Sequence, residues 1–378
     1  MRLKLTILMA LITAVSSGLI AAEPAFVISS IRQKAMGGAG VAIVKDESAV
    51  YVNPAAISEI GFKFNLLRIR ADLNQDAIDK FSDLTTLSSS FGSDKDQTEQ
   101  LTKINSLIPA RFGVNLAGMG PSFGLFGFFI AGGAEAHAIA ELVRPTSPTL
   151  KASILADGQY GIGHDFQVNL FGQDMMVGGA VKTVMRYRTY DASDGGLEFS
   201  MGTGKLLDAM NSGDGQGVEF DTATGSGVGF DLGFKSKMAT FLGDTSAAVV
   251  FNNIGTTITG TKTVSGNESV FSATIPMTTT LGLGFSQDLF LLGSTSFAVD
   301  YKIQPDSTLF KSVYMGFEKT LWLFTLRGGL YQGYPTVGLG MDLLWIFHGN
   351  YAYYTEETGG EAGSAPLSYH LVELGLHF

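Results

Sequence analysis

Side chains that commonly catalyse reactions or bind metal ions are few in this sequence and follow no known pattern. The chain has no Cys, which excludes a thiol nucleophile, a thiolate metal site and a disulfide framework. Its five His residues fit no His-Glu-x-x-His motif. We therefore expect a protein that is not an enzyme and that uses no cofactor and no metal.

Charged side chains within apolar segments are the second group with a chemical role. In one interpretation, one or more of Arg186, Arg188 and Arg327 bind a carboxylate head group through charge-assisted hydrogen bonds. The competing interpretation, favoured for most of the set, is a network of paired charges, because an unpaired buried charge is costly. The residues expected on this one face are Lys182, Arg186, Arg188, Asp231, Lys235, Asp300, Lys302, Glu318, Arg327, Asp342 and Glu373.

The composition indicates what kind of scaffold positions these charges. Gly supplies 48 of the 378 residues, 45% of the residues are apolar and 16% are charged, compared with about 25% charged in a typical soluble domain. The apolar content excludes a disordered chain. Collagen is excluded because Gly follows no period of three and Pro totals 10. The chain is too apolar and too rich in Gly for an ordinary cytosolic protein.

The first 22 residues have the layout of a secretory signal peptide. Arg2 and Lys4 precede an uncharged apolar run at 5–20, and Ala21-Ala22 follows. The run is shorter than the roughly 20 residues that a membrane-spanning helix needs. Cleavage after residue 22 leaves 23 of the 25 basic residues against 35 acidic ones, a formal charge of −12. This balance argues against a nucleic-acid partner.

The remaining sequence predicts a β-barrel in a membrane. No run of 18 apolar residues follows the signal peptide, which excludes a helical membrane protein. A closed barrel is the other structure that pairs every backbone group in hydrocarbon, and its strands alternate apolar and polar residues. Val372, Leu374 and Leu376 alternate in this way with Glu373 and lead to the terminal Phe378. We expect the barrel-assembly machinery to recognise Phe378.

Such alternation recurs along the chain and defines fourteen expected strands. Long connections follow odd-numbered strands and most short turns follow even-numbered ones, as in a bacterial barrel with long external loops and short periplasmic turns. The fold class is therefore all-β, a transmembrane antiparallel barrel of about fourteen strands over 61–378. The expected strands lie near 61–72, 109–118, 122–140, 150–168, 175–191, 226–238, 245–257, 275–287, 294–304, 309–320, 323–332, 335–345, 348–357 and 368–378.

Aromatic residues at the expected strand ends indicate the membrane. Phe123, Phe171, Phe241, Phe290 and Trp322 lie at or beside expected periplasmic turns, as an interfacial girdle requires. A soluble β-sandwich would give similar alternation but has no reason to place rings at alternate turns. The sequence therefore predicts location in the bacterial outer membrane, in contact with its lipid.

The segment before the first strand, 23–60, is expected to be a compact hatch inside the barrel lumen. Gly37, Gly38 and Gly40 allow close backbone approach and positive φ. Asn53 precedes Pro54 and is therefore biased toward an extended conformation, and Ala55 adds to the small residues of the segment. A phosphate-binding loop is excluded because no Gly-Lys-Ser/Thr sequence follows.

Apolar residues at helical spacing occur in two expected external loops. The first loop, near 75–107, includes Phe81, Leu84, Leu101 and Ile104, and the second is near 203–211. The apolar faces of these helices either cap the barrel mouth or form a vestibule where a hydrophobic solute first binds. Both interpretations remain open, because an exposed apolar face needs some partner.

The hatch residues resemble those of the FadL superfamily of outer-membrane proteins. The resemblance rests on Ala35 to Gly40, on Asp46 to Tyr51 and on the Asn53-Pro54-Ala55 motif, with weaker likeness to a PorV-like branch near the C-terminus. It implies fourteen strands, a lumen plugged by the N-terminus, and uptake of long-chain fatty acids or other hydrophobic molecules. The PorV-like branch implies an alternative role, as a partner of secreted proteins in export or surface assembly. A third interpretation is a purely structural membrane protein.

Overall fold

The computed structural model describes most of the chain after residue 29. The expected signal peptide, Leu84, the loop helix near 203–211 and Phe378 lie outside the described residues. The described residues are 30–83, 96–108, 110–125, 127–143, 149–170, 173–190, 199–202, 221–264, 266–289, 292–303, 308–343, 346–358 and 363–377.

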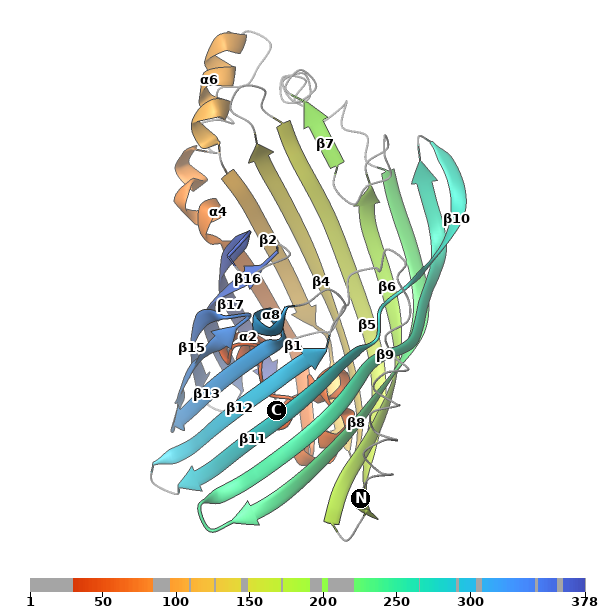
Figure 1. The fold of residues 1–378 in the computed structure, drawn as a ribbon, viewed down its shortest axis with the longest axis vertical. Helices are drawn as coiled ribbons and strands as arrows, with labels where there is room; N and C mark the ends of the chain where they lie inside the picture. The colour runs from red at the N-terminus through yellow and green to blue at the C-terminus, as the bar shows by residue number, and fades with distance from the viewer. Residues whose placement is uncertain are drawn as a thin grey trace.

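The described residues form one closed antiparallel barrel (Figure 1). Each wall strand pairs with its neighbours in chain order, and β1 also pairs with β17, which closes the ring. The fourteen-strand barrel predicted from alternation and loop parity is therefore confirmed. Its strands are β1 (Lys63–Asn74), β2 (Ala110–Met119), β4 (Phe128–Val143), β5 (Thr149–Leu170), β6 (Gln173–Tyr190), β8 (Asp221–Thr240), β9 (Gly243–Val264), β11 (Thr278–Leu289), β12 (Gly293–Ile303), β13 (Val313–Leu321), β14 (Phe324–Tyr331), β15 (Tyr334–Leu343), β16 (Phe347–Glu357) and β17 (Pro366–His377).

Three shorter strands extend this ring. β7 (Phe199–Gly202) pairs with β5, β10 (Asn267–Thr274) pairs with β9, and β3 (Ser122–Leu125) pairs with both β1 and β4. Because β2 has the same two partners, β3 continues the second wall strand.

One expected boundary was therefore wrong. The sequence predicted that a new strand begins at residue 122, whereas the chain reverses near Gly127, which has a φ of 75°. Pro121 has no N–H group and interrupts the ladder without turning the chain. Gly120 still donates a hydrogen bond of 2.9 Å to the carbonyl oxygen of Gly132 across the interruption.

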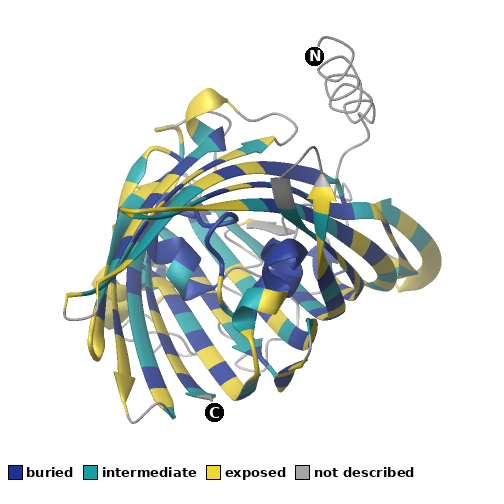
Figure 2. Ribbon diagram, turned by 90° about the horizontal axis from the view of Figure 1, so that it is seen from below, coloured by how far each residue is buried: buried dark blue, intermediate teal, exposed yellow. Residues whose placement is uncertain are grey.

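Side chains alternate between the two faces of the wall. On β12, Phe297, Val299 and Tyr301 are exposed, while Ala298 and Asp300 are buried. Figure 2 shows this alternation around the barrel, with buried and exposed residues following one another along the strands. An exposed apolar outer face and a polar inner face are typical of a barrel that spans a membrane.

Exposed aromatic residues lie at the hairpin ends where the sequence placed a girdle. Phe241 lies in the turn between β8 and β9, Trp322 lies in the turn between β13 and β14, and both are almost fully exposed. Phe62 and Phe123 meet edge to face with 5.9 Å between their ring centres. At the opposite ends of the strands, Tyr301 is also exposed.

Helices occupy the N-terminal segment and the connections. The strand expected at 309–320 begins one turn late, because residues 309–312 are helical and the Ser312 N–H donates to the Thr308 carbonyl oxygen. Among the described residues, no helix is both long and apolar enough to cross a membrane. The helices are α2 (Ile31–Ala35), α3 (Ala49–Val52), the 3-10 helix η1 (Pro54–Ile60), α4 (Gln75–Asp79), α6 (Gln97–Leu107) and α8 (Leu309–Ser312).

Candidate functional site

The N-terminal segment, residues 30–60, lies within the ring of strands. Figure 2 shows its helices as largely buried ribbons enclosed by the wall. Helix α2 contacts β14, β15 and β16, α3 contacts β4, β5 and β9, and η1 contacts β4, β5, β6 and β8. The segment therefore contacts strands on opposite sides of the lumen and fills space between them.

Asn53 connects two parts of the N-terminal segment. Its side-chain oxygen accepts a hydrogen bond of 3.0 Å from the Ala55 N–H and caps η1, and Pro54 occupies the first helical position. Its side-chain amide donates to the Val41 carbonyl oxygen at 2.7 Å. The Asn-Pro-Ala motif therefore begins a helix and holds the preceding loop against it.

At the expected glycine cluster the segment lies directly against the wall. Gly37 has a φ of 63°, and a Cβ placed there would lie 2.3 Å from the Met315 carbonyl oxygen. Gly38, with a φ of 77°, fits between the rings of Tyr314 and Tyr331. The wall also contributes glycine, because a Cβ at Gly329 would lie 2.7 Å from the Gly37 nitrogen. Backbone thus packs directly on backbone.

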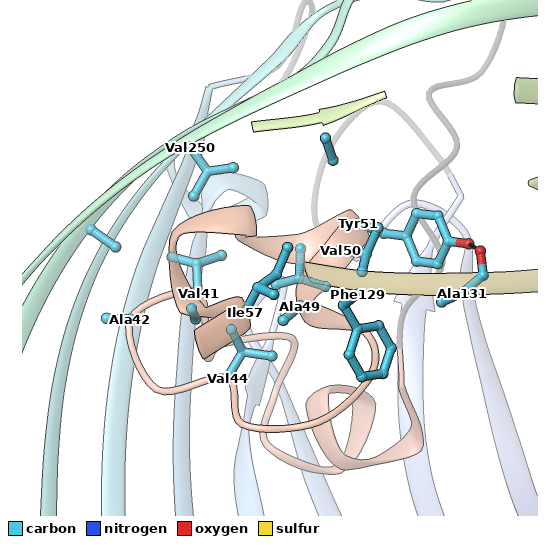
Figure 3. Packing of buried hydrophobic residues seen from close by; sticks show 14 of the residues in the cluster. Val41, Ala42, Val44, Ala49, Val50, Tyr51, Ile57, Phe129, Ala131 and Val250 are labelled. Atoms are coloured by element: carbon cyan, nitrogen blue, oxygen red, sulfur yellow. Dashed lines mark hydrogen bonds between the residues drawn. The ribbon is translucent and has the colours of Figure 1, made fainter. Parts of the chain in front are cut away.

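An apolar cluster fixes the other side of the segment (Figure 3). Val50 and Tyr51 pack among Phe129, Ala131 and other buried residues. The Tyr51 hydroxyl donates a hydrogen bond to the Ala131 carbonyl oxygen. Burial raises the pKa of this hydroxyl, so it remains protonated and able to donate.

Wall side chains satisfy backbone groups of the segment that have no partner strand. Asp300 accepts hydrogen bonds from the Gly40 and Val41 N–H groups at 2.7 and 3.0 Å. Asn252 donates to the Tyr51 carbonyl oxygen at 2.7 Å, and Thr336 donates to the Ala35 carbonyl oxygen at 2.9 Å. Irregular backbone at membrane depth requires internal partners of this kind.

Ion pairs also join the N-terminal segment to the barrel wall. Arg32 donates two hydrogen bonds of 2.9 Å to Glu318, which also accepts one of 2.8 Å from Arg327. Burial lowers the pKa of Arg32, but Glu318 and Asp46 together raise the pKa above its ordinary value, so Arg32 remains charged. Further along the segment, Glu47 pairs with Arg68 of β1, and Glu59 pairs with Lys235 of β8 at 2.8 Å.

Arg186 and Arg327, which were expected to bind a head group, have carboxylate partners in the wall. Arg186 makes two hydrogen bonds of 2.7 and 2.8 Å with Asp157, and Arg327 pairs with Glu318. Arg188 lies two positions after Arg186 on β6 and is also buried. The structure thus places Arg186 and Arg327 in charge pairs of the kind that the network interpretation describes. Of the wider set, Asp342 is exposed.

A row of tyrosines faces the lumen beside α2 and was not anticipated. Tyr314 and Tyr331 have ring centres 5.2 Å apart, Tyr331 and Tyr354 are 5.5 Å apart, and Tyr354 and Tyr369 are stacked at 5.4 Å. These residues are 15 or more positions apart in sequence, so only the strand register brings them together. The sequence signal that could have identified them is the alternation along each strand, which places all four tyrosines at positions that face the lumen.

Two ammonium groups face this tyrosine row. Lys34 Nζ lies 4.5 Å from the ring centre of Tyr354, and Lys302 Nζ lies 4.1 Å from that of Tyr314, distances typical of cation–π contacts. Burial lowers the pKa of Lys34, but Tyr354 and nearby carboxylates raise it overall, so the lysine remains charged. The row combines apolar ring faces with two positive charges, a combination that fits an anionic amphiphile.

The expected vestibule residues divide between surface and interior. Phe81, just after α4, is exposed, Leu101 on α6 is half-buried, and Ile104 on α6 is buried. Lys80 donates to the Leu107 carbonyl oxygen at 3.0 Å, which joins the end of α4 to the end of α6. Among the described residues, no group of three or more His, Asp or Glu could hold a metal ion.

Comparison with known proteins finds structural likeness only. No family model matches the chain. No curated protein sequence matches it either. The Ralstonia pickettii toluene transporter TbuX has a TM-score of 0.42 and 13% identity, over 92% of this chain and 97% of that one. The Pseudomonas putida toluene transporter TodX has a TM-score of 0.45 and 12% identity, over 94% and 99%. A Pseudomonas aeruginosa FadL homologue has a TM-score of 0.33 and 10% identity, over 94% and 99%.

Proposed function

We propose that this protein takes up hydrophobic molecules across the bacterial outer membrane, with residues 23–60 acting as a hatch in the barrel. The observation that carries the proposal is how residues 30–60 are attached. They join the wall through side-chain hydrogen bonds, ion pairs and apolar packing. Such contacts can be released without separating wall strands, so the hatch can move while the barrel stays closed.

The outer face supports the membrane location. Large apolar residues are exposed on alternate positions of strand after strand, including Leu116, Val299, Leu339 and Leu374. In water such a surface would drive aggregation, whereas in a bilayer it faces hydrocarbon.

The tyrosine row and its lysines support the class of substrate. Long-chain fatty acids are the first candidates, because an acyl chain would pack on the rings while its carboxylate pairs with Lys34 or Lys302. The exposed Phe81 near the barrel mouth would offer a first apolar contact.

Uptake into liposomes tests the proposal. The full chain should carry labelled oleate inward faster than protein-free liposomes. Glu318→Gln and Asp300→Asn, which remove the charge of two wall carboxylates that bind the hatch, should change that rate and should admit a small hydrophilic dye that the native chain excludes. Asp244→Asn is the control, because Asp244 forms an exposed ion pair with Lys237 that joins two wall strands and not the hatch to the wall.

Two results would contradict the proposal. Oleate and toluene uptake at the protein-free rate would exclude a hydrophobic-solute channel. Stable co-purification of a secreted protein, together with absent uptake, would favour the export or assembly role instead.

A further inference from the structure

A groove crosses the outer face of the wall. Its volume is about 830 Å³, within the range of roughly 300–1,000 Å³ that small-molecule sites occupy. The groove is lined by residues of β1, β2, β4, β5, β6, β8 and β9, which are consecutive in the ring. At about 4.8 Å between neighbouring strands, it extends roughly 29 Å across them.

The floor of the groove consists of small residues in register. Gly118 pairs with Ala134, which pairs with Gly158, and in the next row Ala136 pairs with Ala156. These five residues point outward, because the residues that alternate with them, such as Glu135 and Asp157, are buried in the lumen. Because none of these five residues carries a large side chain, the outer face is hollowed here.

The two ends of the groove differ in polarity. Ile69 and Leu116 form an apolar end on β1 and β2, and both are more than half exposed. Hydroxyl groups line the other end on β8 and β9, where Ser226 pairs with Thr259 and Thr224 with Thr261. Between the ends stand Met185 and Tyr187, each paired with a floor residue.

We propose that this groove binds one acyl chain of an outer-membrane lipid, with the ester end of the lipid at the hydroxyl groups. The groove is continuous with the apolar belt, and a hollow in a wall that faces hydrocarbon is filled by hydrocarbon because an empty cavity forfeits packing contacts. The hydroxyls of Thr224, Ser226, Thr259 and Thr261 supply hydrogen-bond donors for ester oxygens. The proposal does not depend on what the barrel transports.

Filling the floor tests the site. In Gly158→Leu the added Cβ meets no atom closer than 4.0 Å, so the side chain projects into the groove without disturbing the wall. Ala136→Leu fills the adjacent row. The matched control is Gly328→Leu on β14, an outward position outside the groove whose added Cβ would lie 3.6 Å from its nearest neighbour.

The probe is a phosphatidylethanolamine with a photoactivatable group on its palmitoyl chain, in phosphatidylethanolamine and phosphatidylglycerol vesicles holding the full chain. Cross-links should concentrate on residues 116–136 and 156–187, and the Ala136→Leu/Gly158→Leu variant should lower them roughly tenfold, the effect of about two lost methylene contacts. Gly328→Leu should leave them unchanged. Cross-links spread evenly around the belt, or unaffected by the filled floor, would overturn the proposal. Loss of lipid cross-links with a second copy joined at these residues would also overturn it and assign the groove to a dimer.

Discussion

Arg32 on α2 and Glu318 on β13 meet through two parallel hydrogen bonds of 2.9 Å, although 286 positions separate them in the chain. Arg327 approaches the same carboxylate from β14. A single wall carboxylate thus pairs with one arginine of the barrel and one of the segment inside it. Removing the carboxylate leaves two arginines facing each other in a largely buried site.

The first prediction concerns this pair. Glu318→Gln should cost on the order of 3 kcal/mol, because breaking a buried pair leaves an uncompensated charge. The loss should appear as faster amide hydrogen exchange within residues 30–60, measured by mass spectrometry, while the wall strands stay protected. Asp244→Asn breaks an exposed pair and should cost less than about 1 kcal/mol. Equal exchange in both variants would show that Arg32 does not hold the segment.

The second prediction concerns close approach at Gly37. Gly37→Ala should combine a strained positive φ with a collision against the backbone of Met315 and Leu330. Gly333→Ala is matched to it, because Gly333 has a φ of 87° but no atom lies within 4 Å of an added Cβ. The control should cost only about 1–2 kcal/mol for the φ penalty. Urea unfolding followed by gel mobility should show a clearly larger loss for Gly37→Ala, and similar losses would mean that the segment shifts to make room.

The third prediction concerns Tyr51. Tyr51→Phe removes one hydrogen bond to the Ala131 carbonyl oxygen and should cost about 1 kcal/mol. Tyr51→Ala also empties a fully buried site and should cost about 3–5 kcal/mol. Proteolysis within residues 30–60 should follow the same order. If the two variants behave alike, the hydroxyl rather than the ring anchors α3.

The fourth prediction separates charge from apolar contact in substrate binding. Lys34→Met and Lys302→Met should each weaken oleate binding by about tenfold, since a charge-assisted hydrogen bond contributes about 1.5–3 kcal/mol. Toluene binding, which needs no charge, should be unchanged. Lys237→Met, at an exposed site, should affect neither ligand. Equal losses for oleate and toluene would indicate a structural role for the lysines.

Alternation was enough to predict the barrel, because each strand carries its own apolar and polar faces in its local sequence. It failed around Gly120 and Pro121, where residues typical of a turn interrupt a strand that continues. Turn residues report local backbone preference, but the pairing of β3 with β1 is decided by the register of a strand more than 50 residues away.

The candidate site was predictable in part for a related reason. Gly37, Gly38 and Asn53 were identifiable because their roles depend on backbone conformation and capping, which nearby sequence encodes. The tyrosine row was not, because Tyr314, Tyr331 and Tyr354 become neighbours only through cross-strand register. Likewise, nothing local to Arg327 indicates that Arg32 shares its carboxylate.

The pairing of β1 with β17 also constrains how the molecule assembles. This seam joins strands from opposite ends of the chain, and residues 30–60 lead directly into β1. Because contacts so distant in sequence form late in folding, we expect the pairing of β1 with β17 to be the last step in closing the barrel. We therefore expect the segment to dock on the concave side of the curling sheet before the seam closes, so a mutation that delays its docking should yield closed barrels in which the segment is not docked.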